Sequence, residues 1–499
     1  MRKVFFYILL IAYSGAYGSN WWPLPMDNDD FSRDTIGYHV GLSAMAGSGR
    51  YSAFWMQSNQ NGCVSLSPYS GTVGMGIVKH ATRPNRWYDY SFALEAYGIA
   101  HSSFSGNPLY GQLSHFPVGQ WNKGEVVVRN CHAHLRLYIV DISVGVMPLT
   151  DDMNTPLGTG SLLLSNNAPP MPVVRIGLDR WTAIPGLFGY AELKGGIIHA
   201  WLNDNTYMPG CKLHYKHIGL QLGGKLPVNI SYEFHHAAQW GGYSPDGSDL
   251  GNDFRSFSSV FLANKGGSSY NESLNALGNH LGSQQWTLTA KGKGWKTIVY
   301  WQNLLEDNFD FIGRGHNLPD GRWGVSVSQS LWPFINRLTI EYVGTTDQSG
   351  PLHDQDGIIY AGFDNYYCNS IYRQGWNYYL RSLGTPLITS PIYNQIAHEQ
   401  TLNNRVKAWH IGIGGDIYGF HYSLLGTYAQ NYGRYNDKEF WHDMQSHNIA
   451  LMLDIEKTVE KAWGLQFGLR IAADFGTQWG NQVSAMFTIA KNGILTNYR

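Results

Sequence analysis

The chain has 499 residues and a formal net charge of −1, with 35 basic and 36 acidic residues. No basic stripe runs along it, which excludes nucleic acid as an expected partner. Charged residues make up only 14% of the chain, against about 25% in a typical soluble domain. Aromatic residues also reach 14%, including 32 Tyr and 18 Trp. Because Tyr and Trp are enriched at membrane surfaces, this composition favours a protein that faces lipid.

The N-terminus has the features of a secretory leader. Arg2 and Lys3 precede an apolar stretch over residues 4–13, and Ala16 and Gly18 are small residues typical of a signal-peptidase site. So short an apolar stretch cannot cross about 30 Å of hydrocarbon. We therefore expect residues 1–18 to be a signal peptide and residues 19–499 to form a single domain. No later stretch is long and apolar enough for a spanning helix.

Alternation of apolar and polar residues predicts strands throughout the mature chain. The clearest runs are residues 90–101, 126–139, 190–201, 212–222, 228–236, 286–291, 296–304, 323–329, 337–343, 409–414, 417–428, 448–456, 465–474 and 482–490. The alternation changes phase near Val140, which indicates a bulge or a tight turn. With the weaker runs, we count about 18 strands, with a range of about 16–20, as expected for a large barrel.

The C-terminal hairpin shows the two faces of these strands most clearly, because side chains two apart share a face. One face is apolar: Ile449, Leu451, Leu453, Leu465, Phe467 and Leu469. The other face carries Asp454, Glu456, Arg470 and Asp474. A soluble sandwich would turn the charged face to water, whereas an outer-membrane barrel turns the apolar face to lipid. With the leader and the low charge content, this pattern predicts an all-β, transmembrane antiparallel β-barrel in the outer membrane.

Long polar connections separate some of the predicted strands. Residues 241–252, 308–322 and 345–360 are rich in Gly, Asn and Asp, and we expect these loops on the external surface. Residues 384–404 contain Pro386 and Pro391 and show little alternation. This segment is predicted to be either a long loop or an element folded into the lumen.

Short motifs follow one another over most of the chain. They are YSAFWMQSN at 51–59, GSLLLSNNAP at 160–169, QWGG at 239–242, GNHLGS at 278–283, YWQN at 300–303, DGRWGV at 320–325, EYV at 341–343, TDQSGP at 346–351, DNYY at 364–367, GWNY at 375–378 and RSLGTPL at 381–387. Their order resembles the Wzi-type capsule assembly family of outer-membrane proteins. The resemblance implies a barrel that binds exported capsular polysaccharide and helps to assemble or retain the capsule at the cell surface.

The residues that we expect to contact polysaccharide combine aromatic, amide and charged side chains. Alternation turns three of them toward the lumen, and the others form a dense cluster after residue 363. The candidates are Tyr300, Gln302, Glu341, Asp364, Asn365, Tyr366, Tyr367, Tyr372, Trp376 and Arg381. Two structural alternatives stay open. Glu341 could instead pair with Arg381 or another basic residue and brace the interior, and the aromatic residues could form an interfacial girdle.

Other functions have less support in the sequence. His132 and His134 share a strand face that could hold a metal ion, but no third ligand has a recognisable spacing, so no metal is expected. No Gly-x-Ser-x-Gly, His-Glu-x-x-His or P-loop motif occurs, so we expect neither an enzyme nor a cofactor. The four cysteines allow up to two disulfides, and their spacing gives no pairing. Polysaccharide and outer-membrane lipid are the expected partners of a monomer; the alternative is a porin-like channel for sugars or other small solutes.

Overall fold

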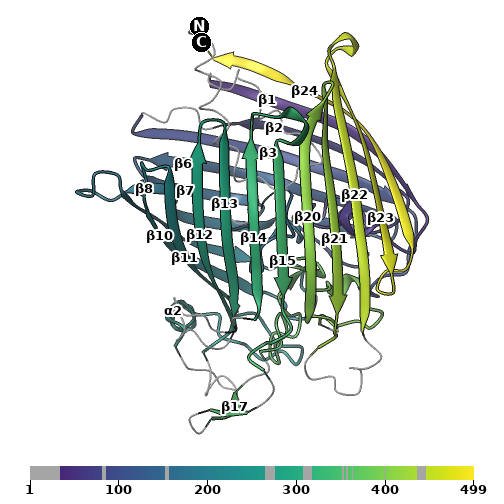
Figure 1. Cartoon of the computed structure of the whole chain (residues 1–499). Helices are drawn as coiled ribbons and strands as arrows, with labels where there is room; N and C mark the ends of the chain where they lie inside the picture. Colours follow the sequence, from purple (N-terminus) through teal and green to yellow (C-terminus); the bar gives the residue numbers. More distant parts are fainter. Residues whose placement is uncertain are drawn as a thin grey trace.

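The computed structural model describes residues 34–498 except 81–85, 152–154, 156, 265–275, 307–316, 318, 351–352, 356–357, 362–363, 399 and 435–444. In this part of the chain, 18 antiparallel strands form one closed barrel (Figure 1). The last strand pairs with the first from Asp34↔Tyr498 to Gly47↔Ser484, which closes the cylinder. The predicted fold class is therefore confirmed. The expected signal peptide lies outside the described residues.

The barrel strands follow one another around the wall in sequence order. They are β1 (Asp34–Gly47), β2 (Ser70–Lys79), β3 (Tyr88–His101), β6 (Gly124–Leu137), β7 (Val140–Met147), β8 (Met171–Ala183), β9 (Ala191–Trp201), β10 (Lys212–Leu222), β11 (Val228–Trp240), β12 (Asn279–Gly292), β13 (Trp295–Leu305), β14 (Gly321–Gln329), β15 (Arg337–Gly344), β20 (Val406–Ile417), β21 (Phe420–Asn431), β22 (Ser446–Val459), β23 (Leu465–Gly476) and β24 (Gln482–Tyr498).

Smaller elements lie in the connections. The short β4 (Ser114–His115) and β5 (Val118–Trp121) pair with each other, and β5 also pairs with β6. Two further hairpins are β16 (His353–Gln355) with β17 (Ile358–Ala361), and β18 (Asn377–Tyr378) with β19 (Arg381–Ser382). The α-helices are α1 (Phe54–Gln57) and α2 (Phe254–Leu262), and three short 3-10 helices are η3 (Pro333–Ile335), η4 (Pro391–Tyr393) and η5 (Glu460–Ala462). No helix in the described ranges is long and apolar enough to cross a membrane.

Connections alternate between short and long around the barrel. Strands β6 and β7 are joined by Tyr138 and Ile139 alone, and Tyr138 has φ 53°, so the predicted phase change near Val140 is a tight turn. Long connections, including the one that contains α2, lie at the opposite end from both ends of the described chain (Figure 1). Because short turns face the periplasm in outer-membrane barrels, the long connections mark the external end.

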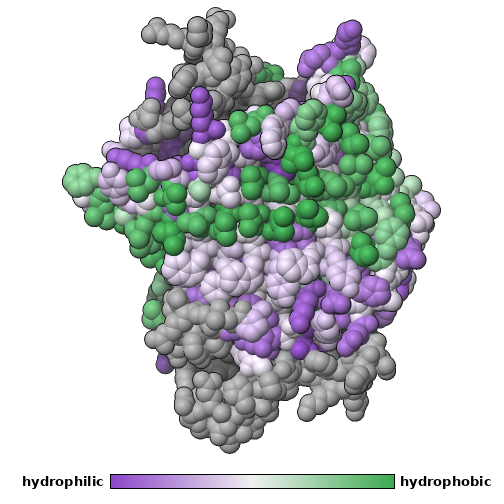
Figure 2. All heavy atoms as spheres, viewed as in Figure 1, coloured by the Kyte–Doolittle hydropathy of each residue, from purple (hydrophilic) through white to green (hydrophobic). Residues whose placement is uncertain are grey.

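The outer face of the wall is apolar, and the inner face is polar. Leu451 on β22 is 43% exposed, whereas Asp474 on β23 is fully buried, which confirms the predicted phase of the C-terminal hairpin. Figure 2 shows the exposed apolar residues as a continuous band around the visible side. A row of aromatic residues borders the band, with direct register across seven strands: Tyr232, Trp286, Trp301, Trp323, Tyr342, Trp409 and Tyr428. Such a row is an interfacial girdle.

Candidate functional site

Three segments of the external connections fold back into the barrel, and we call them the luminal plug: residues 51–68, 157–170 and 366–394. Every residue of the first two segments is buried, as are residues 374–392 of the third. Because the third segment includes most of 384–404, the sequence alternative of an element inside the lumen is confirmed for residues 384–394. The plug packs against the lumen-facing side of the wall.

The first plug segment is fixed to the C-terminal strands. The Phe54 N–H donates to Asp474 Oδ2 at 2.8 Å, and the Trp55 indole N–H donates to Thr427 Oγ1 at 3.0 Å. The Ala53 N–H donates to Ser484 Oγ at 2.9 Å. These partners belong to β21, β23 and β24, so the segment packs against strands that are far from it in sequence, of which β24 is the barrel neighbour of β1.

Glu341 fixes the second plug segment to the wall. Its carboxylate accepts the Thr159 N–H at 2.7 Å and the Thr159 hydroxyl at 2.6 Å. It also accepts a hydrogen bond from the Tyr300 hydroxyl and lies 4.0 Å from Arg322 Nη1. All four side chains are buried. Glu341 therefore braces the interior, which is the alternative to sugar binding that the sequence left open. The nearby cation is Arg322 rather than Arg381.

Gln302 holds the same segment from β13, two strands away from Glu341 on β15. Its amide oxygen accepts the Leu162 N–H at 2.9 Å, and its amide nitrogen donates to Ser161 Oγ at 2.7 Å and to Ser283 Oγ at 3.1 Å. Both ends of the amide are thus satisfied by the plug and the wall, which a buried amide requires. The predicted luminal orientation of Tyr300, Gln302 and Glu341 agrees with this geometry.

The aromatic cluster packs inside the plug rather than at the membrane interface. The Trp376 indole N–H donates to the Leu163 carbonyl at 2.8 Å, and the Tyr367 hydroxyl donates to the Leu162 carbonyl. Tyr366 and Tyr372 are also buried, with exposed fractions of 0% and 1%. The girdle alternative is therefore wrong for these residues. Their ring faces are covered in this conformation, and ligand contact by them stays a prediction.

The remaining predicted site residues also connect plug and loops. Asp364 Oδ2 accepts hydrogen bonds from Asn317 Nδ2 at 2.9 Å and from Ser349 Oγ at 2.6 Å. Asn365 Oδ1 accepts one from Asn404 Nδ2 at 2.9 Å. Arg381 Nη1 donates to Gln57 Oε1 at 2.5 Å and so joins the first and third plug segments. The structure thus brings the ten predicted residues into or around one buried assembly.

Two buried carboxyls hold external segments by accepting backbone N–H groups. Asp204 Oδ2 accepts the Tyr379 N–H at 2.9 Å, and burial raises the pKa of Asp204 to about 7. Asp320 accepts the N–H groups of Asp347 at 2.9 Å and Gln348 at 2.8 Å, and burial raises its pKa to about 6. The role of these two carboxyls could not be predicted from the sequence, because their hydrogen-bond partners are main-chain N–H groups, which every residue type except proline carries.

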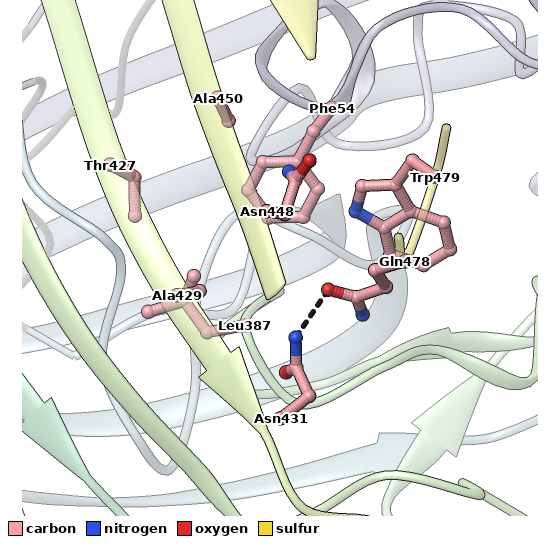
Figure 3. A pocket seen from close by; sticks show the side chains of 9 residues that line it. All are labelled: Phe54, Leu387, Thr427, Ala429, Asn431, Asn448, Ala450, Gln478 and Trp479. Carbon is pink, nitrogen blue, oxygen red and sulfur yellow. Dashed lines mark hydrogen bonds between the residues drawn. The ribbon is translucent and has the colours of Figure 1, made fainter. Parts of the chain in front are cut away.

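Two small depressions are lined by wall or loop residues together with plug residues. The first has a volume of about 10 Å³ and is lined by nine residues that include Phe54, Asn431, Gln478 and Trp479 (Figure 3). Asn431 Nδ2 donates to Gln478 Oε1 across it. A space of about 10–15 Å³ holds one water molecule.

The second depression carries an accessible aromatic ring and has a volume of about 20 Å³. Tyr207 is half-buried, and the Arg373 guanidinium lies 5.5 Å from its ring centroid. The ring of the exposed His398 is 5.8 Å from Tyr207. An aromatic face bordered by a cation and an imidazole offers both stacking surface and hydrogen-bond donors. Sequence reasoning missed this group because Tyr207 precedes Arg373 by 166 residues.

The cysteines form no disulfide, and one group of side chains has the composition of a metal site. Cys63, Cys131, Cys211 and Cys368 form no disulfide in the structure. Among the described residues, one group could offer three metal ligands: His134, Asp141 and Asp179. Arg175 lies 2.6 Å from Asp179 and neutralises it. His132, which the sequence paired with His134, is not in the group. We assign no metal here.

Closed strands, an outward apolar band and a polar interior filled by connections define an outer-membrane β-barrel with an occluded lumen. A family model of the capsule assembly protein Wzi matches residues 132–405, more than half of the chain. The chain belongs to this family, and the protein is located in the outer membrane.

One similar solved structure supports the barrel fold, and two others cover most of the chain at lower TM-scores. Wzi of Escherichia coli, described as an outer-membrane protein involved in group 1 capsule assembly and a carbohydrate-binding β-barrel, gives a TM-score of 0.54 at 12% identity, over 92% of this chain and 84% of that chain. OccK5 (OpdH) of Pseudomonas aeruginosa gives a TM-score of 0.44 at 8% identity, over 93% of this chain and 98% of that chain. A BenF-like porin of Pseudomonas fluorescens Pf-5 gives a TM-score of 0.45 at 10% identity, over 92% of this chain and 99% of that chain. No curated protein sequence matches at a significant level.

Proposed function

We propose that this barrel binds exported capsular polysaccharide at its external end and retains it at the cell surface without chemical change. The observation that carries the proposal is the luminal plug, because a barrel filled by its own external connections offers a surface rather than a passage. The family supports the choice of ligand, since its name and its solved relative both concern capsule assembly.

The accessible contact that we propose is the group formed by Tyr207, Arg373 and His398. Sugars present apolar C–H faces that stack on aromatic rings and hydroxyls that accept hydrogen bonds from cations. Of the aromatic residues discussed at this end, Tyr207 is half-buried, whereas Tyr367 and Trp376 are fully covered. We assign the covered residues the role of holding the plug that supports this surface.

Capture of purified capsular polysaccharide by the folded protein tests the assignment. Tyr207→Ala and Arg373→Ala should each weaken binding, because stacking surface or a donor is lost while the barrel is untouched. Tyr367→Phe is the matched control: it removes a buried hydroxyl, keeps the ring, and should leave binding unchanged. If only Tyr367→Phe weakens capture, the contact surface lies in the lumen and our assignment fails.

The function itself is tested in cells. Deletion of the gene should release capsule from the cells and increase the polysaccharide recovered from the medium. The channel alternative makes the opposite prediction: an unchanged capsule, with steady single-channel conductance from the purified protein in a planar bilayer. That pair of results would replace capsule retention with solute transport.

A further inference from the structure

Helix α2 lies on the outside of the barrel wall, beside the lipid-facing surface. On β11, Gln239 faces the lumen, because its side-chain N–H donates to the Gly375 carbonyl of the plug at 2.9 Å. Successive side chains alternate, so Ala238 and Trp240 point outward. These two residues pack with Val260 of α2 and with Leu277. Figure 1 shows α2 beside the external ends of the strands.

The helix stands beside a second row of aromatic and basic residues, which crosses β11 at Trp240 whereas the girdle crosses it at Tyr232. Trp201, Lys212 and Trp240 are in direct register on β9, β10 and β11, and Trp201 is 39% exposed. Lys212 Nζ lies 4.7 Å from the Trp240 ring centroid. Lys216 Nζ lies 4.4 Å from the Phe261 ring centroid of α2. Ile218, two residues further along the same face of β10, is 58% exposed in the apolar band.

The apolar face of α2 is wider than the part of the helix that packs against the wall. At about 100° per residue, Phe254, Phe257, Val260, Phe261 and Leu262 span an arc of about 200°. Val260 is buried against the wall, and Phe257 and Phe261 are half-buried. Phe254 is 81% exposed and Leu262 is 63% exposed.

We propose that α2 is an interfacial helix that inserts Phe254 and Leu262 into the outer leaflet of the membrane and so anchors the external connection between β11 and β12. The occupant of its free face is lipid, because the helix stands on the outward side of the wall and adjoins the apolar band. Lys212 and Lys216 on the same wall face hold this connection in place, because Lys212 Nζ donates to Asn252 Oδ1 and Lys216 Nζ donates to the Phe261 carbonyl.

Spin-label depth measurements test the proposal in vesicles of phosphatidylcholine with lipopolysaccharide. Each variant carries Cys131→Ser to remove the exposed thiol, and the other three cysteines are buried. Labels at Phe254→Cys and Leu262→Cys should be more accessible to oxygen than to a water-soluble nickel complex. A label at the exposed Ser248→Cys, in the same connection, should show the reverse order. Heat-modifiability on gels confirms that each variant is folded.

Two results would overturn the insertion of α2. The first is nickel accessibility at positions 254 and 262 equal to that at 248, which would leave the helix in water. The second is spin–spin broadening between labels at position 254 that disappears on dilution with unlabelled protein. That result would make a second copy of the chain, rather than lipid, the occupant of the helix face.

Discussion

Replacing Glu341 with Ala should loosen the plug and make the barrel conduct. The substitution removes the acceptor of both Thr159 hydrogen bonds and of the Tyr300 hydroxyl, and it leaves Arg322 without the carboxylate 4.0 Å away. Removing one partner of a buried ion pair costs about 3–5 kcal/mol, and each hydrogen bond to a charged group contributes about 1.5–3 kcal/mol. These contributions share one carboxylate and do not add, so we expect a loss of about 3–5 kcal/mol.

Two measurements follow the effect of Glu341→Ala. Urea unfolding in lipid vesicles gives the change in stability, and planar-bilayer recording gives the conductance, which should be absent in the wild type and present in the variant. Glu233→Ala is the matched control, because Glu233 pairs with Lys194 at 2.9 Å between two wall strands. The control should lose stability without conducting. Equal conductance in both variants, or stability of Glu341→Ala within about 1 kcal/mol of wild type, would refute the assigned tether.

Leu451→Arg places a charge on the lipid face of β22 and should cost about 2–4 kcal/mol in vesicle unfolding if the site lies near the midplane; a cost near zero would remove this face from the lipid. Asp204 has a pKa of about 7 in the fold and about 3.9 unfolded, so its favourable contribution is complete below about pH 4 and lost as pH rises through about 7. The stabilising effect of Asp204→Asn should therefore be about 2–3 kcal/mol larger at pH 8 than at pH 5, and equal melting shifts at both pH values would contradict this. Trp376→Phe removes the N–H bonded to the Leu163 carbonyl and should lower stability by about 1–3 kcal/mol. Trp463→Phe, at an 84% exposed turn position, should have no measurable effect; equal losses would show that the buried hydrogen bond is unimportant.

The wall could be predicted from the sequence because alternation is a local property. The faces on which Leu451 and Asp474 lie can be predicted without knowing their neighbours in space, because strand geometry fixes the two-residue repeat of side-chain direction. The aromatic girdle could not be predicted in the same way. Trp286, Trp301 and Trp323 lie side by side only after register is set, and register depends on pairing between strands.

The plug was only partly visible in the sequence. Residues 384–404 stood out by their lack of alternation, but nothing local distinguishes a loop that enters the lumen from one that covers it. Tyr366, Tyr367 and Trp376 have the composition of either a sugar platform or a packed core. Only their long-range acceptors, such as the Leu162 and Leu163 carbonyls, place them in the core. Thr159, which meets Glu341, was missed for the same reason.

The bonds of the first plug segment also constrain the order in which the protein assembles. The Phe54 N–H reaches Asp474, 420 residues later, and the Ala53 N–H reaches Ser484, 431 residues later. Contacts of such sequence separation form late, because most of the chain must be in place before they close. The N–H groups of Ala53 and Phe54 therefore reach these acceptors only after β23 and β24 have joined the wall. Docking of this part of the plug is linked to completion of the cylinder, and a barrel stalled before its last strands would lack both bonds.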